Sequence, residues 1–459
     1  MRPEDVYALA GASDPRIDPT GTWIAYAVWG IDAEANEYRG NVWLAPVDGS
    51  QPPRRFTTGE RRDSLPRWSP GPFDWPRHSQ IAVVDLDSRE RRVLTESLDR
   101  QCAPYPDNRE VAWEGDRIVF SVEDRGCVHV YAVASDGSAE PELLLGGERV
   151  VKGWDVDRDT LVHVSSTATT FGELYVGDRQ VTDVTAPFPA TLLEPERFTA
   201  VSADGSEVEA WLVRPPGLAE GATCPVLLNI HGGPFSQYTV AFFDEFQVYA
   251  GAGYAVVYAN PRGSSGYSEE WGRAIRGPGE GVGPGWGTVD YEDLMAVADE
   301  ALRRFEFLDA DRFGVMGGSY GGYMTTWIVG RTNRFRAACS ERAVNHLVSA
   351  YGSSDLFWAF KGMFGTYPWE DVQTHLERSP ATYADRIETP LLILHAEGDL
   401  RCDVEQAEHL FITMRLLGKE VEFVRFPGES HELSRSGSPV HRVQRFEAIL
   451  EWFDRHLKA

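Results

Sequence analysis

Lysine is almost missing from this chain of 459 residues, which has only four lysines; its other basic residues are arginines. The 44 basic residues face 70 acidic ones, so the net charge is −26. No run of basic residues could follow a phosphate backbone, and a surface of this sign repels polyanions. We therefore expect no nucleic-acid partner.

Cysteine is also scarce, and its five residues form no C-x-x-C pair. An odd number without close pairs argues against a disulfide framework or a four-thiolate zinc site, and favours reduced, buried thiols. The chain contains neither H-E-x-x-H nor a phosphate-binding G-x-x-x-x-G-K-[ST] motif. We expect no metal and no cofactor.

Long hydrophobic runs are lacking as well. No window approaches the roughly 20 apolar residues of a membrane-spanning helix, and the polar start of the chain does not resemble a signal peptide. These absences predict a cytoplasmic protein without a membrane partner. Its length and its 42% hydrophobic residues instead suggest at least two globular domains.

Residues 1–190 read as short β segments separated by turns, with almost no helical periodicity. About four similar units follow one another, each with strands and a turn, near the ~40 to 45 residues of a β-propeller blade. The second unit lacks its expected turn and inner strand at residues 70–79. We expect a β-propeller-like domain that is incomplete there; an unusually small propeller is the alternative.

Residues 191–459 change to strands that alternate with helices. Continuous apolar segments at 226–230, 254–258, 313–316 and 391–394 are typical of strands buried on both faces, and 291–305 has helical spacing. This order predicts a doubly wound, mainly parallel sheet.

The segment 317–322 (GGSYGG) contains G-x-S-x-G between a predicted strand and a predicted helix, as a nucleophile elbow requires. In such a sheet an acid follows a later strand and a histidine follows the last one. Asp399 and His431 hold those places and complete a Ser319, Asp399, His431 triad. Asp403 is a rival acid, and the rival histidines are His395, His409, His441 and His456.

An acyl-transfer serine also needs hydrogen-bond donors for the oxyanion. The backbone N–H of Tyr320 is one candidate, since Tyr320 follows the serine directly. The second is the N–H of Gly233, in the His-Gly-Gly-Pro turn at 231–234 that follows an earlier strand. A plain tight turn is the alternative for this second segment.

Several segments, in order, resemble the prolyl oligopeptidase family of serine peptidases, and its acylaminoacyl-peptidase-like branch most. They are 231–234, 260–267 (NPRGSSGY), 317–324, 340–344, 399–401 and 426–433. The resemblance implies a propeller followed by an α/β-hydrolase catalytic domain, and a peptidase for short peptides. It assigns the same triad and the same oxyanion donors, Gly233 and Tyr320.

Substrate recognition is less defined. Arg401, two residues after the acid, would contact substrate or form an ordinary surface ion pair. Phe357, Trp358 and Phe360 would line an apolar primary pocket, or belong to a plain core.

We expect a serine peptidase that cleaves oligopeptides or N-acylated peptides through an acyl-enzyme, with small peptides as its partners and homo-oligomers left open. An esterase with the same triad is one alternative. The other is an interaction scaffold whose hydrolase half is inert.

Overall fold

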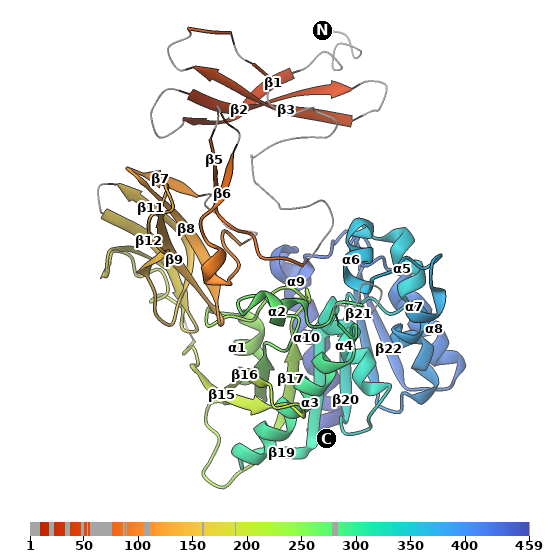
Figure 1. The fold of residues 1–459 in the computed structure, drawn as a ribbon. Coiled ribbons are helices and arrows are strands. Elements are labelled where there is room, and N and C mark those ends of the chain that lie inside the picture. Colours follow the sequence, from red (N-terminus) through yellow and green to blue (C-terminus); the bar gives the residue numbers. More distant parts are fainter. Residues whose placement is uncertain are drawn as a thin grey trace.

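The structure is a computed structural model, and its parts differ in architecture along the chain (Figure 1). It describes residues 10–17, 23–32, 37–46, 50–52, 54–55, 76–85, 88, 90–104, 111–157, 160–188, 190–277 and 283–458. Within these residues the N-terminal part is built from strands, and the C-terminal part from alternating strands and helices. The omission expected at 70–79 falls largely outside the described residues, which resume at Pro76.

The N-terminal strands form three antiparallel four-stranded units and one hairpin. The units are β1–β4 (Ala10–Ile17, Trp23–Asp32, Glu37–Pro46, Arg54–Arg55), β7–β10 (Ala112–Glu114, Arg117–Asp124, Cys127–Ala134, Glu142–Leu145) and β11–β14 (Val150–Asp157, Thr160–Thr167, Thr170–Val176, Arg179–Gln180). The hairpin is β5 (Ala82–Val84) with β6 (Arg91–Val93), and a 3-10 turn follows at Glu96–Leu98. These are the four units expected from the sequence, the second of them reduced to two strands.

The unit β7–β10 packs on both of its faces. Phe120 and Val122 of β8 contact Leu94 and its neighbours on the hairpin side, while Val119 packs with Trp154 of β11. A single parallel pair, Val128 with Val150, also joins β9 to β11, so that β7–β14 form one eight-stranded sheet. Stacked units of this kind support the blade prediction, and their closure around a channel stays a prediction.

The C-terminal part is organised around an eight-stranded sheet in the order β15-β16-β18-β17-β19-β20-β21-β22. Its strands are Pro195–Val201, Glu207–Val213, Cys224–Ile230 (β17), Ala255–Ala259 (β18), Leu308–Gly318, Ala337–Glu341, Leu391–Ala396 and Val421–Phe426. Neighbouring strands from β18 to β22 run parallel, and β15 and β16 add an antiparallel edge. The mainly parallel sheet expected from the apolar segments is confirmed.

Helices cover both faces of this sheet (Figure 1), because alternate residues of its strands point to opposite sides. Val226 and Leu228 of β17 join the core under α3, α4 and α8, whereas Leu227 joins the core under α1 and α10. The helices are α1 (Asp244–Gly251), α2 (Glu269–Arg273), α3 (Val289–Arg304), α4 (Tyr320–Val329), α5 (Leu347–Ser353), α6 (Phe360–Phe364), α7 (Val372–Glu377), α8 (Glu405–Leu416), α9 (Leu433–Ser436) and α10 (Pro439–Leu457), with 3-10 segments at Phe357–Ala359 and Pro380–Arg386.

The turn between β8 and β9 joins the two parts. The N–H of Arg125 donates to the Gly266 carbonyl at 2.8 Å, and the carbonyl of Gly126 accepts from the N–H of Val240 at 2.9 Å. Gly126 has a φ of +79°, and a Cβ there would lie 3.2 Å from the Trp211 ring, so the turn needs glycine. The β-rich part is thereby held beside the loops that follow β17 and β18.

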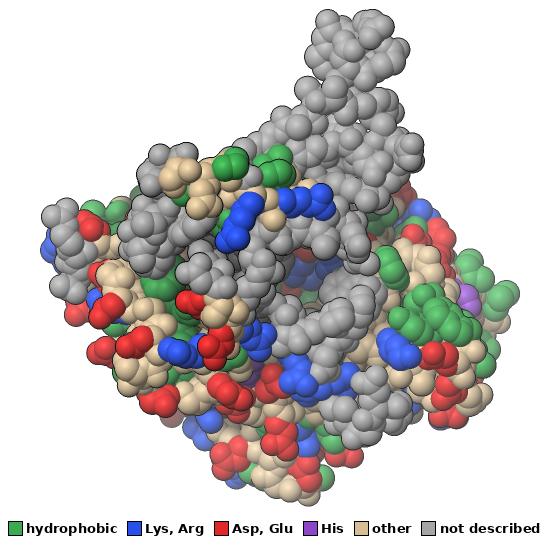
Figure 2. Space-filling model, turned by 45° about the horizontal axis from the view of Figure 1, so that its top comes forward, with side chains coloured by type: hydrophobic (Ala, Val, Ile, Leu, Met, Phe, Trp, Pro, Cys, Tyr) green, Lys and Arg blue, Asp and Glu red, His purple; other side chains and the backbone are tan. Residues whose placement is uncertain are grey.

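The surface agrees with the composition. On the face shown in Figure 2, acidic side chains of the described residues are spread among basic and polar ones. All five cysteines are buried and unpaired, which confirms the expected reduced thiols. None of the described helices has the length and apolar content needed to cross a membrane.

Candidate active site

Ser319 lies in a tight turn between β19 and α4, with φ at 63° and ψ at −120°. A non-glycine residue rarely adopts this backbone, which costs roughly 1–3 kcal/mol and is typical of functional turns. Its glycine neighbours make the turn possible, because a Cβ on Gly321 would lie 2.0 Å from the Ile230 carbonyl oxygen. The N–H of Ser319 donates to the Glu341 carbonyl on β20 at 2.9 Å. The sequence-predicted elbow is therefore present as a strand, turn and helix.

His431 reaches this serine from the loop after β22. Its Nε2 lies 3.1 Å from the Ser319 Oγ, and its Nδ1 lies 2.7 Å from Asp399 Oδ2. Because a carboxylate only accepts, Nδ1 carries the proton and Nε2 is free to accept one from the serine. Residues from three separate loops thus form one chain of hydrogen bonds.

Asp399 is completely buried after β21. Its Oδ1 accepts the backbone N–H groups of Arg401 and Cys402, each at 2.8 Å, which leaves Oδ2 facing His431. The main-chain N–H groups of Arg401 and Cys402, both in the loop after β21, thus hold the carboxylate in position.

The rival residues have other contacts. Asp403 accepts the N–H of Glu405 at the start of α8. His395 lies 3.5 Å from Asp399, but its Nε2 donates to the Cys402 carbonyl at 2.7 Å. His409 lies in α8, and His441 and His456 lie in α10. Among the predicted histidines, the structure brings His431 to the serine.

Burial sets the protonation of the histidine. It lowers the pKa of His431 below the usual 6.5, the hydrogen bond to Asp399 acts in the opposite direction, and the nearby Arg342 guanidinium lowers it further. At neutral pH the imidazole is therefore neutral and able to act as a base.

The turn 231–234 lies against the serine, since a Cβ on Gly232 would be 3.3 Å from the Ser319 Cβ. The buried His231 donates from Nδ1 to the Gly232 carbonyl at 2.7 Å, and burial lowers its pKa to about 4. In a trans peptide the C=O and the following N–H point in opposite directions. The N–H of Gly233 therefore points away from His231, and Gly233 itself has a φ of +125° that suits glycine.

Tyr320 begins α4, so its backbone N–H belongs to the first turn, whose donors have no acceptor within the helix. The second main-chain N–H of the predicted pair belongs to Gly233, in the turn that lies against the serine. Such a pair can stabilise negative charge on a substrate oxygen.

The four predicted recognition residues have different surroundings. Arg401 forms a two-point ion pair with Asp355, with its Nη2 3.1 Å from Oδ2, on a partly exposed surface. Phe360 is buried in the core, whereas Phe357 is 55% exposed. The side chain of Trp358 lies outside the described residues. Asp355 also donates its N–H to the Leu400 carbonyl, which ties this segment to the acid loop.

A buried group of charged residues beneath the site was not found from the sequence. Arg445 of α10 donates to both oxygens of Glu341 at 2.7 and 2.6 Å, and to Glu245 of α1 at 2.9 Å. Burial alone would raise the pKa of Glu341, but the guanidinium groups of Arg445 and Arg342 lower it to about 2. Arg445 falls on the apolar stripe of its helix, and a charge at that position was an available signal.

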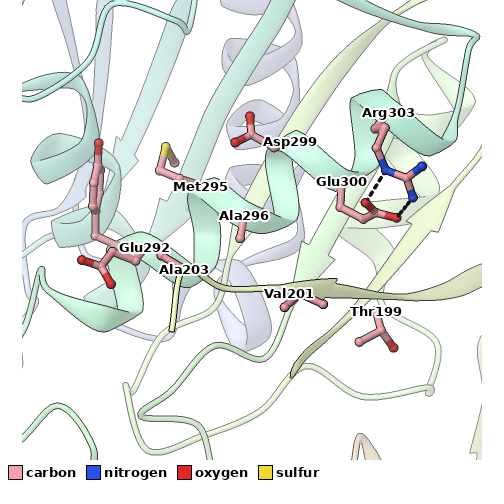
Figure 3. A pocket seen from close by; sticks show the side chains of 10 residues that line it. Thr199, Val201, Ala203, Glu292, Met295, Ala296, Asp299, Glu300 and Arg303 are labelled. Atoms are coloured by element: carbon pink, nitrogen blue, oxygen red, sulfur yellow. Dashed lines mark hydrogen bonds and ion pairs between the residues drawn. The ribbon is translucent and has the colours of Figure 1, made fainter. Parts of the chain in front are cut away.

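A groove of about 710 Å³ lies away from these residues, between the edge strand β15 and α3 (Figure 3). Three carboxylates and Arg303 line it with apolar side chains, and Arg303 pairs with Glu300. None of the candidate catalytic residues contributes to its walls. Among the described residues, no group of three or more possible ligands could hold a metal ion.

Comparisons with known proteins place this geometry in context. Residues 240–459 match the model of the prolyl oligopeptidase family. The uncharacterized peptidase YuxL of Bacillus subtilis is 39% identical over 400 residues, covering 83% of this chain and 59% of that protein. A probable dipeptidyl-peptidase 5 of Emericella nidulans is 26% identical, covering 98% of this chain and 65% of the relative. The chain thus spans about 59–65% of the length of these relatives.

Solved structures of acylaminoacyl peptidase are also similar. The Pyrococcus horikoshii protein superposes with a TM-score of 0.76 at 25% identity, covering 97% of this chain and 89% of the other. A complex of acylaminoacyl peptidase with Z-Gly-Gly-Phe-chloromethyl ketone gives a TM-score of 0.77 with the same identity and coverage.

Proposed function

Because residues 240–459 belong to the prolyl oligopeptidase family, we propose that this protein is a serine peptidase that hydrolyses short peptides through an acyl-enzyme. The observation that carries the proposal is the chain of hydrogen bonds from Ser319 Oγ through His431 to Asp399, at 3.1 and 2.7 Å. An acyl-transfer serine needs this order of nucleophile, base and orienting acid.

In the proposed reaction, Ser319 Oγ attacks the scissile carbonyl carbon while His431 Nε2 takes the hydroxyl proton. Asp399 keeps the imidazole in the required tautomer and stabilises the imidazolium that forms. The N–H groups of Gly233 and Tyr320 stabilise the oxyanion. His431 then gives its proton to the departing amine, and a water molecule repeats the steps to release the acid.

The proposed substrates are oligopeptides or N-acylated peptides. The proposed organisation is a β-propeller-like domain over residues 1–190 and an α/β-hydrolase domain over residues 191–459. The acylaminoacyl peptidase complex with a peptidyl chloromethyl ketone supports a peptide ligand. The exposed Phe357, tied to the acid loop through its neighbour Asp355, is the proposed apolar contact for a substrate side chain.

A fluorophosphonate probe tests the proposal directly. The folded protein should be labelled at Ser319 and should hydrolyse a short peptide anilide, and Ser319→Ala should lose both properties. Hydrolysis that survives in Ser319→Ala would refute the assignment. Esters cleaved without any anilide turnover would favour the esterase instead, and a folded protein without labelling would favour the scaffold.

One pair of matched substrates, which differ only at the N-terminus, distinguishes the possible substrate classes. The names of the relatives point both to the release of dipeptides and to acylated amino acids. An acetylated and a free-amine form of the same peptide anilide separate these possibilities. We expect faster turnover of the acetylated form, and a strong preference for the free amine would refute the acylaminoacyl-type specificity alone.

A further inference from the structure

The side chain of Tyr320 contacts α3, while its backbone N–H belongs to the first turn of α4, directly after the serine. The ring is buried, and its hydroxyl donates to Asp290 Oδ2 at 2.6 Å. Burial, together with the adjacent carboxylate, raises the pKa of Tyr320 well above its usual 10, so the hydroxyl stays protonated. The side chain of the residue that follows the nucleophile is thus anchored at its hydroxyl end.

Asp290 collects several donors in the first turn of α3. Its carboxylate accepts backbone N–H groups from Gly287 at 3.0 Å, Thr288 at 2.6 Å and Tyr291 at 3.0 Å, in addition to the Tyr320 hydroxyl. A carboxylate at the N-terminus of a 16-residue helix is also favoured by the helix dipole. These interactions fix the carboxylate in position.

The loop before α3 contacts α4 at a second place, in addition to the hydrogen bond between Tyr320 and Asp290. The Gly287 carbonyl accepts from Trp327 Nε1 at 2.9 Å, and a Cβ on Gly287 would lie 2.2 Å from the Trp327 ring. The ring of Trp286 stands edge-on to the Tyr320 ring, with centroids 5.0 Å apart. Tyr320 and Trp327 are two helical turns apart on the same face of α4, so the loop before α3 contacts the helix at both of these turns.

We infer that Asp290 is a positioning residue for the oxyanion site, which holds the first turn of α4 through the Tyr320 hydroxyl and so aims the Tyr320 N–H. The inference rests on the proposed function. An oxyanion donor works only when it is fixed 2.7–3.1 Å from the developing charge. A hydroxyl and a carboxylate outside the substrate site therefore contribute to the rate.

Tyr320→Phe is the decisive variant, since it keeps the buried ring and removes only the hydroxyl. We expect kcat to fall about tenfold with KM unchanged, less than the 10²–10³-fold loss when an oxyanion donor is removed entirely. A peptidyl trifluoromethyl ketone, which forms a tetrahedral adduct with the serine, should bind weaker by a similar factor. A product-like peptide without the ketone should bind as before.

Tyr323→Phe is the matched control. Tyr323 is buried one turn later in α4, stacks on Tyr320 with ring centroids 6.0 Å apart, and its hydroxyl has no hydrogen-bond partner among the described residues. Removal of that hydroxyl should leave kcat, KM and ketone binding unchanged. Equal losses in both variants would show that any cavity in α4 slows the enzyme, and would overturn the inference.

Asp290→Asn completes a double-mutant cycle. If the carboxylate acts through the hydroxyl, Asp290→Asn combined with Tyr320→Phe should lower kcat no further than Asp290→Asn alone. Losses that add would overturn the inference, as would an unchanged kcat in Tyr320→Phe. An active wild type that needs Ser319 keeps these outcomes separate from failure of the proposed function, and an inactive wild type would overturn both.

Discussion

Arg445 offers the sharpest test of how the site is supported. It is 1% exposed and donates to two carboxylates, Glu341 and Glu245, with hydrogen bonds of 2.6–2.9 Å. Arg445→Met keeps most of the volume and removes the cation. Breaking one partner from a buried ion pair costs about 3–5 kcal/mol, because the remaining charge is left without compensation. We expect that loss in the free energy of unfolding.

The matched control lies in the same helix. Arg455 pairs with Glu422 and Glu451, but its side chain is 45% exposed, and those of its partners are 47% and 77% exposed. Exposed pairs contribute about 0–1 kcal/mol. Arg455→Met should therefore change the free energy of unfolding by less than about 1 kcal/mol. Equilibrium urea unfolding, followed by tryptophan fluorescence, measures both variants.

The pH dependence distinguishes the uncompensated charge from a packing defect. Burial raises the pKa of Glu245 even beside Arg445, whereas Arg445 and Arg342 lower that of Glu341 to about 2. Without Arg445 the pKa values of both carboxyls should rise in the folded protein. Folded pKa values above those of wild type mean that the folded variant takes up protons at higher pH than folded wild type does, so its loss of stability relative to wild type becomes smaller as pH falls. The deficit of Arg445→Met relative to wild type should shrink between pH 7 and 5.

Turnover provides an independent measure. The backbone carbonyl of Glu341 accepts the Ser319 N–H, so displacement of this residue moves the elbow. We expect a lower kcat in Arg445→Met even well below its melting transition. A loss under 1 kcal/mol, or a deficit that does not change with pH, would refute the claim that this arginine compensates buried charge.

Other predictions follow from the elbow and from the histidine. Gly321→Ala should destabilise by about 3 kcal/mol and abolish labelling, because its Cβ would lie 2.0 Å from the Ile230 carbonyl oxygen; Gly352→Ala, with nothing within 4 Å, is the control and should be neutral or slightly stabilising. Ser319→Gly should have a free energy of unfolding about 1 kcal/mol higher than Ser319→Ala, and so a higher urea midpoint, because glycine tolerates the φ of 63°. Equal midpoints would show that the serine backbone stores no strain. For His431, burial lowers the pKa below 6.5, so kcat/KM should be constant near pH 7 and fall through a midpoint below 6.5; a midpoint above 6.5 would contradict the cause assigned.

The elbow was predictable because its requirements are local. A serine among glycines, between an apolar strand and a helix, defines the turn at 317–322 without any distant contact. The parallel sheet then places Asp399 and His431 on the same edge, since loops after parallel strands meet there. Sequence order alone could choose His431 over His395, although the structure brings His395 within 3.5 Å of the same carboxylate.

The β-rich part was predictable as units but not as a connected whole. Alternating strands and turns indicate β7–β10 and β11–β14, yet the two units merge into one sheet through a single backbone pair, Val128 with Val150. One backbone pairing leaves no pattern in the sequence. The contact of the Arg125 and Gly126 turn with the loops after β17 and β18 is similarly invisible, because it uses main-chain groups that any residue carries.

The supporting residues were missed for a different reason. Arg445 and Asp290 carry no motif, and in the sequence they are charged residues in amphipathic helices, where most such residues face solvent. Their roles arise only when folding places Arg445 between Glu245 and Glu341, and Asp290 under Tyr320. Each contacts a residue next to the serine and not the serine itself, so a search for reactive side chains passes over them. In this chain the proposed catalytic side chains could be found from the sequence, and the residues that support them could be found only from the fold.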